Sequence, residues 1–505
     1  MHTRTDFVNN SASKDTMTLS ETRFISGPTP KLDLVYSDVW LPGIYSRRIL
    51  TFELPDNSSH ERALDCLHRA LKSLVDGTPE LGGLVVALPV DDAANKEDVP
   101  WKAIKPYKGI EFRIKDLRNQ IPSYKKLESK GFPVAAFKDE LLVPVPVMYQ
   151  PEPNAVMIMQ ASLIDGGLLL TVCLCHSLTD GNGMNAITIS LAEQCKIAAQ
   201  VEGALGPRTM NMDRKVMVEL TGNKKELSDH PAYGRVEGAF KPKVETEEGP
   251  AHEGNGTKEP LKDSVIMEDE PEKQAAAAPP PAQVHTYRIS TANASALKDI
   301  ASKQGRVSTH DAIAALMWRT LTVSRYKAGR LSMEKTSTYT FPHNSRRHVG
   351  LPKDWVGNCC YFVSASLPVS RILEPDSLPV LAAAIRAGLN AVNKEVVGGI
   401  MELRRPCSYD ITWWPLFEVN EPWILMMTSL YHSELFGVDF GDSLGRVKHF
   451  GTSDEGVMGG IRSVGLVGAK VDGGGCDVSL GLDGEEEAFV KEDEVWSEFV
   501  REVGK

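Results

Sequence analysis

The sequence predicts a mixed α/β (α+β) protein made of two halves of similar size. Segments with the apolar pattern of strands mix with segments of helical spacing in both halves, without a strict strand–helix–strand repeat. An acidic stretch rich in alanine and proline separates the halves. Because 505 residues suffice for two or three full cores, we expect a disordered tail at 1–20, domains at 21–204 and 284–505, and a crossover linker at 205–283.

Charge and composition limit the classes of partner. The net charge of −11 argues against nucleic acid or an anionic membrane as the main partner. No apolar run approaches the roughly 18 residues that cross a bilayer, and the first residues lack the apolar region of a signal peptide. The eight cysteines form no C-x-x-C pair. We therefore expect a cytoplasmic protein with free thiols.

In the first half, two helices and several strands can be predicted. Leucines at helical spacing predict a helix over Glu61–Val75, which Asp76–Pro79 ends. A second helix is expected at about Gly183–Gln200. Extended segments are expected within Leu32–Leu54 and at Leu141–Met148, Ala155–Gln160 and Leu168–Cys175.

The linker has the composition of a solvated segment. Between Val244 and Lys273 there are ten Glu or Asp residues against three Lys, with few apolar residues. Ala275–Ala278 and Pro279–Pro281 follow as a low-complexity stretch. Such a composition buries too little apolar surface to fold alone.

The second half again mixes strands and helices. The motif Ser308–Asp311 is a capping box that opens an apolar helix over Ala312–Val323. Strands are expected at Val284–Ile289 and Pro422–Tyr431, with further strands after Val447, and helices at Thr291–Lys303, about Leu378–Val392 and near Glu494–Val503.

The most informative segment of the first half is the one that ends in His176. An apolar strand delivers this histidine to a polar turn, and Asp180 and Gly181 follow where a helix begins. A histidine has an unperturbed pKa near 6.5, which suits proton transfer at neutral pH. The same H-x-x-x-D spacing occurs at His2, but in a polar tail with no strand before it and no glycine after the aspartate. Context therefore favours the second copy.

Two other interpretations of His176 remain open at this point. It is equally compatible with a structural histidine at a strand end, with Asp180 as a helix cap. A zinc site with Cys173 and Cys175 is disfavoured, because these two cysteines share one face of the strand and His176 points to the other.

A second motif, Asp439-Phe440-Gly441, follows the apolar strand of the second half. The same three residues mark the magnesium-binding loop of protein kinases. The chain has no His-Arg-Asp loop before them and no lysine-bearing glycine-rich loop, so a kinase is excluded. A structural loop whose glycines adopt positive φ is the simpler explanation.

Together, His176-x-x-x-Asp180-Gly and Asp439-Phe-Gly resemble the two signatures of BAHD acyltransferases, in the fungal branch typified by trichothecene 3-O-acetyltransferase. Further matching segments run in the same order along the chain: Pro79–Gly83, Ile164–Leu168, Val307–Ala312 with Met317–Arg319, and Leu351–Asn358. The resemblance covers nearly the whole chain except the linker.

The chain departs from the family pattern at two places. The family motif usually ends Asp-Phe-Gly-Trp-Gly, whereas Gly441 is followed by Asp442-Ser-Leu-Gly445. The family's Arg-x-Arg appears as Asn344-Ser-Arg346, so only the second arginine is matched.

The resemblance implies two chloramphenicol-acetyltransferase-like domains with an active-site tunnel at their interface. It implies His176 as the general base for direct acyl transfer from acyl-CoA, without a covalent intermediate. Asp180 is expected to pair with Arg346 and, with Gly181, to support the turn. Asp439 and Gly441 are expected to support the fold. No metal and no permanently bound cofactor are expected.

The residues that bind CoA are less sharply indicated. Lys303 and Arg306 precede the helix start at Ser308 and Thr309, and helix N-termini bind phosphate. Ser308 is equally well explained as a plain helix cap. Thr428 and Ser429 lie on the apolar strand before Asp439 and could face the acyl group, although polar positions in a core strand explain them equally well.

The resemblance thus predicts a monomeric acyltransferase that moves an acyl group, with acetyl favoured, from acyl-CoA to a hydroxyl or amine of a small molecule. A fungal secondary metabolite is the expected acceptor. Two alternatives remain: a carrier-protein-dependent condensation domain, and a ligand-binding protein without turnover. A condensation domain would carry a second histidine where Cys175 stands.

Overall fold

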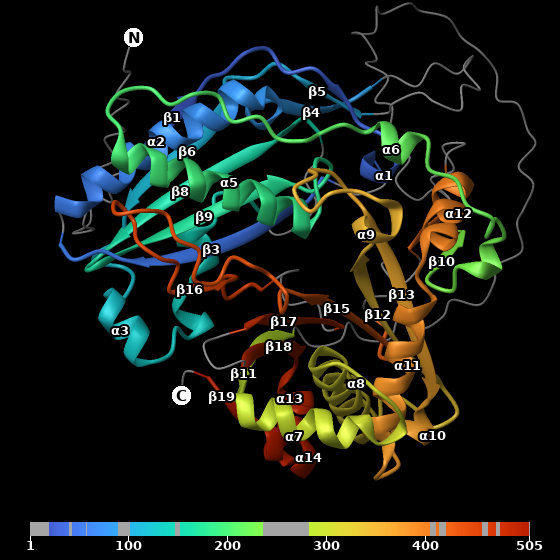
Figure 1. The fold of residues 1–505 in the computed structure, drawn as a ribbon. Coiled ribbons are helices and arrows are strands. Elements are labelled where there is room, and N and C mark those ends of the chain that lie inside the picture. Colours follow the sequence, from blue (N-terminus) through green and yellow to red (C-terminus); the bar gives the residue numbers. More distant parts are fainter. Residues whose placement is uncertain are drawn as a thin grey trace, which may run out of the picture.

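The computed structural model describes two halves, each built on a β-sheet with helices packed against it (Figure 1). The described residues are 20–39, 43–56, 58–88, 102–146, 152–235, 282–404, 411–413, 421–456, 463–470 and 475–503. Within these ranges, none of the helices combines the length and the apolar character needed to cross a membrane.

The first half contains a six-stranded sheet whose centre is β9 (Gly167–Cys175). All nine residues of β9 are buried, because antiparallel neighbours flank it on both sides and helices cover the sheet. In order across the sheet, the strands are β1 (Ser20–Ile25), β6 (Ile110–Asp116), β8 (Met157–Ile164), β9, β3 (Tyr45–Glu53) and β16 (His449–Gly451). The β6–β8 pair is parallel and the other pairs are antiparallel.

Two long helices, α2 (Ser58–Gly77) and α5 (Gly181–Gln200), pack against each other over this sheet (Figure 1). The predicted leucine stripe explains α2, since Leu67, Leu71 and Leu74 are fully buried. Shorter elements are α1 (Tyr36–Val39), η1 (Pro79–Gly82), α3 (Tyr124–Ser129), η2 (Val134–Ala136), α4 (Asp139–Leu142) and a small sheet in the order β2 (Leu32–Asp33), β5 (Lys102–Lys105), β4 (Leu84–Ala87), β7 (Asn154–Ala155).

The extended segment predicted at Leu141–Met148 is wrong at its start, where α4 forms instead. Buried polar side chains of the sheet satisfy the carbonyl groups at the end of this helical turn. Gln160 Nε2 donates to the carbonyl oxygens of Leu141 (2.8 Å) and Leu142 (3.1 Å), and Thr171 Oγ1 donates to that of Leu142 (2.8 Å). Residues 147 and 148 lie outside the described residues.

The first part of the predicted linker is ordered and packs against the rest of the chain. Residues 205–235 contain α6 (Lys215–Val218), η3 (Leu227–Asp229) and β10 (Tyr233–Arg235), which pairs with β14 (Ile411–Trp413). Met217 and Tyr233 are buried in the core of the second half. The acidic run and the alanine–proline stretch lie outside the described residues.

The second half contains a seven-stranded sheet and most of the remaining helices. In order, the strands are β13 (Cys360–Pro368), β12 (Thr336–Asn344), β15 (Ile424–Ser429), β17 (Val464–Lys470), β18 (Cys476–Leu482), β11 (Gln283–Ile289) and β19 (Val500–Glu502). The helices are α7 (Thr291–Ala301), η4 (Ser302–Gln304), α8 (Thr309–Lys327), α9 (Arg346–Val349), α10 (Val369–Ile372), α11 (Ser377–Ala391), α12 (Lys394–Arg404), α13 (Gly484–Glu492) and α14 (Glu494–Phe499).

The elements that were predicted in this half match closely except at the C-terminal end, whereas β12, β13, α12 and α13 were not predicted. The helix predicted near Glu494–Val503 ends at Phe499, and Val500–Glu502 continue as β19, the edge strand beside β11. Val500 and Phe499 are buried, so the chain gains both core packing and strand hydrogen bonds by leaving the helix here.

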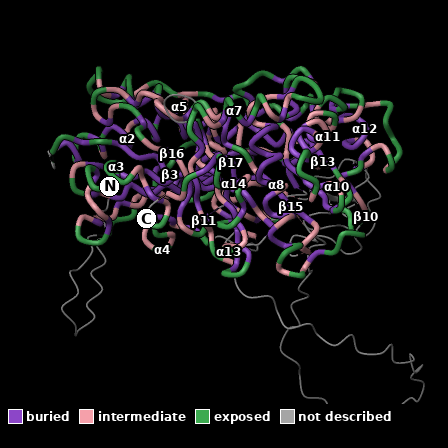
Figure 2. Tube along the Cα trace, turned by 90° about the horizontal axis from the view of Figure 1, so that it is seen from below, coloured by how far each residue is buried: buried purple, intermediate pink, exposed green. Residues whose placement is uncertain are grey.

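Buried residues occur throughout both halves (Figure 2). The hydrophobic core of the first half also includes residues from the second half of the sequence. The segment around the second motif crosses from the second half into the first core. Phe440 is fully buried against Phe52 of β3, with ring centroids 4.9 Å apart in an edge-to-face arrangement. A few residues later β16 pairs with β3 and completes the first sheet.

The glycine of the second motif sits where this crossing loop touches α5. Gly441 has φ +80°, and a Cβ at this position would lie 2.9 Å from the Cα of Lys196. Gly445, in the same loop, has φ +76° but no atom near its would-be Cβ. Both positions favour glycine by conformation, and only Gly441 does so by packing as well.

We expect Gly441→Ala to lower the free energy of unfolding more than Gly445→Ala does. The control substitution carries only the cost of the left-handed backbone conformation, about 1–2 kcal/mol, whereas Gly441→Ala also pushes against the backbone of α5. Urea unfolding of the two variants measures the difference. Equal losses would mean that the contact between this loop and α5 is loose enough to yield.

Candidate active site

The sheet and α5 hold His176 at a tight turn between two buried elements. The backbone N–H of His176 donates to the carbonyl oxygen of Ile44 (2.8 Å), and that of Leu178 donates to Cys175 (2.9 Å), which closes the turn. Between Cys175 and Asp180, every residue except His176 is buried. His176 is therefore the one residue of this turn that is not fully buried, although its Nδ1 is enclosed and has no hydrogen-bond partner among the described residues.

Burial lowers the pKa of His176, and the negative charge of Asp180 opposes only part of this shift. The positive charge of Arg48 adds to the lowering. A lowered pKa keeps the imidazole neutral at physiological pH, which is the protonation state that a general base requires.

Asp180 caps α5 and joins it to the second half. Its Oδ1 accepts from the backbone N–H groups of Asn182 and Gly183, both at 3.0 Å. Both carboxylate oxygens accept from the guanidinium of Arg346 at 2.8 Å, and Oδ2 also accepts from the backbone N–H of Cys359 at 2.9 Å. The predicted ion pair between Asp180 and Arg346 is thus present.

The electrostatics of this carboxylate follow from its partners. Burial alone would raise the pKa of Asp180, but the charge and hydrogen bonds of Arg346, together with the backbone donors, lower it to about 2. A carboxylate that stays ionised and is fully occupied by these donors cannot take part in proton transfer. Asp180 instead holds the turn in place through these hydrogen bonds.

A second buried ion pair lies on the other side of the same turn. Asp38 of α1 accepts from Arg214 Nε at 2.8 Å, and Arg214 also donates to the carbonyl oxygen of Leu178 at 2.9 Å. Both guanidiniums, of Arg214 and Arg346, lie over the ring of Trp355, at 5.1 and 5.3 Å from its centroid. The indole therefore contacts both buried cations, one of which binds the turn at Leu178 and the other at Asp180.

Asn358 connects this second pair to His176. Its side-chain amide donates to Asp38 Oδ1 and to the backbone carbonyl oxygen of His176, both at 3.0 Å. Sequence reasoning recognised the Gly357-Asn358 segment but gave it no role, and it missed Asp38 and Arg214. No local motif marks these residues, because they come together only in the folded chain.

The other residues predicted to support the site lie apart from His176 or make few contacts. A Cβ at Gly181 would meet only the end of the Arg48 side chain, at 3.8 Å, so packing does not require glycine there. Asp439 is partly exposed, accepts from the backbone N–H of Gly441 at 2.9 Å, and has Lys196 and Arg446 as its nearest cations, at 3.8 and 3.7 Å.

The predicted CoA residues form a separate group around the start of α8. Lys303 and Arg306 are exposed. Ser308 caps the helix, accepting from the backbone N–H of Asp311 at 3.2 Å, while Asp311 Oδ2 accepts from the backbone N–H of Ser308 at 2.7 Å. Arg386 of α11, which sequence reasoning missed, donates to Ser308 Oγ at 2.9 Å and also contacts Asp311. The helix start thus already holds a carboxylate of its own chain.

The end of β15 lies beside this helix start. Thr309 interacts with the hydroxyl of Tyr431, which follows β15, and Thr428 and Ser429 are the last residues of that strand. Thr428 is partly buried and Ser429 is exposed. The structure therefore brings the predicted CoA residues near one another, in a group distinct from the contacts of His176.

Comparison with known proteins shows which family the chain resembles. Residues 44–195 match the profile described as the trichothecene 3-O-acetyltransferase-like N-terminal domain. The trichothecene 3-O-acetyltransferase TRI101 of Fusarium sporotrichioides is 24% identical over 94% of this chain and 97% of its own length. These matches confirm the resemblance to fungal BAHD-type acyltransferases that the two motifs predicted.

Solved structures of BAHD-type proteins share the fold. The crystal structure of F. graminearum TRI101 complexed with coenzyme A and deoxynivalenol matches with a TM-score of 0.75 at 20% identity, over 94% of this chain and all of that one. Vinorine synthase matches with a TM-score of 0.58 at 16% identity, over 97% of this chain and all of that one. The predicted fold of two chloramphenicol-acetyltransferase-like domains is confirmed.

One relative of similar identity carries a different name. The enoyl-CoA isomerase/hydratase claC of Penicillium crustosum is 26% identical over 94% of this chain, which spans about half (51%) of that relative. The O-acyltransferase pigD of Monascus ruber is 24% identical over 79% of this chain and 83% of its own length.

Removing the carboxylate of Asp180 is expected to destabilise the protein strongly. Asp180→Ala leaves the guanidinium of Arg346 buried without a counter-charge, a change that costs about 3–5 kcal/mol of unfolding free energy. Urea unfolding measures it. Lys353→Ala, which breaks the exposed pair with Glu434, serves as the control and should leave stability nearly unchanged. A similar midpoint for both variants would show that the buried pair contributes nothing.

Proposed function

We propose that this protein transfers an acyl group from acyl-CoA to a hydroxyl or amine of a small molecule, with His176 as the general base. The observation that carries this proposal is the setting of His176: a partly exposed imidazole with a lowered pKa, on a turn whose other residues are buried and fixed by two ion pairs.

The chemistry follows from a neutral imidazole next to two substrates. His176 takes the proton of the acceptor hydroxyl as its oxygen attacks the thioester carbonyl carbon. The tetrahedral intermediate then collapses, the carbon–sulfur bond breaks, and the imidazolium returns the proton to the CoA thiolate. Holding both substrates in place supplies much of the acceleration, and the base adds about 10²–10⁴-fold.

The donor and acceptor are inferred from relatives and from the chemistry of the chain. Structures of the related TRI101 include complexes with coenzyme A or ethyl coenzyme A, and three of these complexes also contain the toxin deoxynivalenol or T-2. Several relatives are named O-acetyltransferases. We therefore favour acetyl-CoA as the donor and a hydroxyl of a fungal secondary metabolite as the acceptor.

Within this chain, the exposed cations Lys303 and Arg306 are suited to the phosphates of CoA, because they stand in front of the helix start without taking part in its cap. Ser308 is committed to the cap and to Arg386, so its contribution to CoA binding would be indirect. Thr428 and Ser429 are proposed to face the acyl end of the donor.

We expect His176→Ala to lower acyl transfer by about 10²–10⁴-fold. Release of free CoA from acetyl-CoA is measured with a panel of hydroxylated acceptors. His2→Ala, in the other copy of the H-x-x-x-D pattern, is the matched control and should retain full activity. Turnover that survives His176→Ala would rule out the general-base role.

The same assay separates the alternative functions. Acyl transfer that requires an acyl carrier protein in place of CoA would favour a condensation domain. Binding of acceptors without CoA release, in the wild-type protein as in the variant, would favour a ligand-binding protein.

The pH dependence of kcat/KM should reflect the lowered pKa of His176. The neutral imidazole is the active form, so activity is lost as pH falls through the folded-state pKa, and the acid limb should lie below pH 6.5. Arg48→Met removes a charge that lowers this pKa and should move the limb to higher pH. A limb above pH 6.5 in the wild-type protein, or one that Arg48→Met leaves unchanged, would contradict this assignment.

A further inference from the structure

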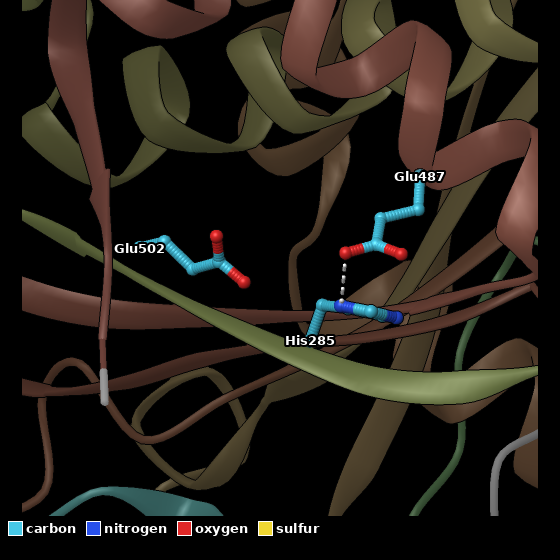
Figure 3. Close-up of side chains that lie close together, drawn as sticks. All are labelled: His285, Glu487 and Glu502. Atoms are coloured by element: carbon cyan, nitrogen blue, oxygen red, sulfur yellow. Dashed lines mark ion pairs between the residues drawn. The ribbon is translucent and has the colours of Figure 1, made fainter. Parts of the chain in front are cut away.

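Three potential metal ligands converge in the second half, on the edge of its sheet (Figure 3). They are His285 of β11, Glu487 of α13 and Glu502 of β19, and one nitrogen or oxygen atom of each lies within 4.8 Å of the other two. His285 Nδ1 and Glu487 Oε1 are 3.3 Å apart, and their side chains are only 14% and 21% exposed. The three residues come from positions that no sequence motif connects.

The fold explains why these side chains meet. Tyr287 is the cross-strand partner of Glu502, and His285 lies two residues before Tyr287 and so points to the same face of β11. Glu487 belongs to α13, which follows β18, the strand on the other side of β11. The cluster thus ties two neighbouring strands to the helix above them.

The ligand set suits a divalent ion of the first transition series. Zinc takes imidazole nitrogen and carboxylate oxygen at about 2.0–2.2 Å in a tetrahedron, which places neighbouring ligand atoms about 3.3–3.5 Å apart. The His285–Glu487 separation already has this value. The remaining separations, at most 4.8 Å, require the carboxylates to close by about an ångström, which rotation of their flexible side chains provides.

A buried hydroxyl beside the cluster points to a ligand independently. Tyr287 is only 3% exposed, and its hydroxyl has no hydrogen-bond partner among the residues that the structure describes. Tyr287 is the cross-strand partner of Glu502, so its side chain lies on the same face of the sheet as the cluster. An unpaired buried hydroxyl is costly, and a water molecule on a bound ion would give it a partner.

We propose that His285, Glu487 and Glu502 bind one divalent transition-metal ion, with zinc as the best fit, and that the ion fastens α13 and the C-terminal strand to β11. Three protein ligands leave a fourth position for water. Lys491 also forms an ion pair with Glu487 and partly neutralises its carboxylate. Binding of the metal ion to this carboxylate therefore displaces the lysine. The site is structural and separate from the acyl-transfer chemistry proposed for His176.

Calorimetric titration of the chelator-treated full-length protein with Zn²⁺ tests the proposal. One equivalent is expected to bind and to raise the melting temperature. His285→Gln and Glu502→Gln should each weaken binding at least tenfold, and circular dichroism checks that both variants are folded. Loss in either folded variant supports the site, and unchanged binding in both would overturn it.

His343→Gln is the matched control. His343 Nε2 and His348 Nε2 lie 3.3 Å apart and form a second place where zinc could bind to histidine. This variant should retain the bound equivalent. Loss of binding in His343→Gln, with retention in His285→Gln, would assign the ion to the histidine pair and refute the proposal.

Co²⁺ in place of Zn²⁺ tests the ligand type. Nitrogen and oxygen ligands in a tetrahedron should give visible absorption bands without the intense near-ultraviolet band of cobalt bound to thiolate. A thiolate band would place the ion at one of the cysteines and overturn the assignment.

Discussion

The carboxylate of Asp180 is the point at which the two halves of the molecule and the turn carrying His176 meet. It caps α5 in the first half and accepts both arms of the Arg346 guanidinium and the Cys359 N–H from the second. A buried charge is tolerated only when its partners are complete. The donors around Asp180 come from both halves, so the halves must be docked for the charge to be satisfied. The turn that carries His176 therefore keeps its conformation only when the two halves are docked.

Much of this arrangement could be predicted from the sequence, because it depends on local patterns. The strand before His176, the cap at Asp180 and the capping box at Ser308 are short-range features that helix and strand chemistry impose. The pairing with Arg346 came from family resemblance, since 166 positions separate the two residues. The fold followed from the same resemblance, as composition alone indicates only a mixed α/β class.

The rest depends on contacts that no short segment encodes. The Asp38–Arg214 pair and the hydrogen bonds of Asn358 join three distant segments, and each residue alone looks like an ordinary polar position. The α4 turn forms where a strand was predicted because Gln160, from another strand, satisfies its carbonyl groups. Arg386 similarly reaches the start of α8 from α11. Tertiary hydrogen bonds of this kind override the local pattern.

The position of β16 in the chain delays completion of the first sheet during translation. It pairs with β3, yet about 400 residues separate the two in the chain. At about 5–20 residues per second, translation leaves the outer edge of β3 without its neighbour for roughly 20–80 s. An uncovered edge strand is a template for aggregation. The first sheet therefore gains its last strand only after most of the second half has been made.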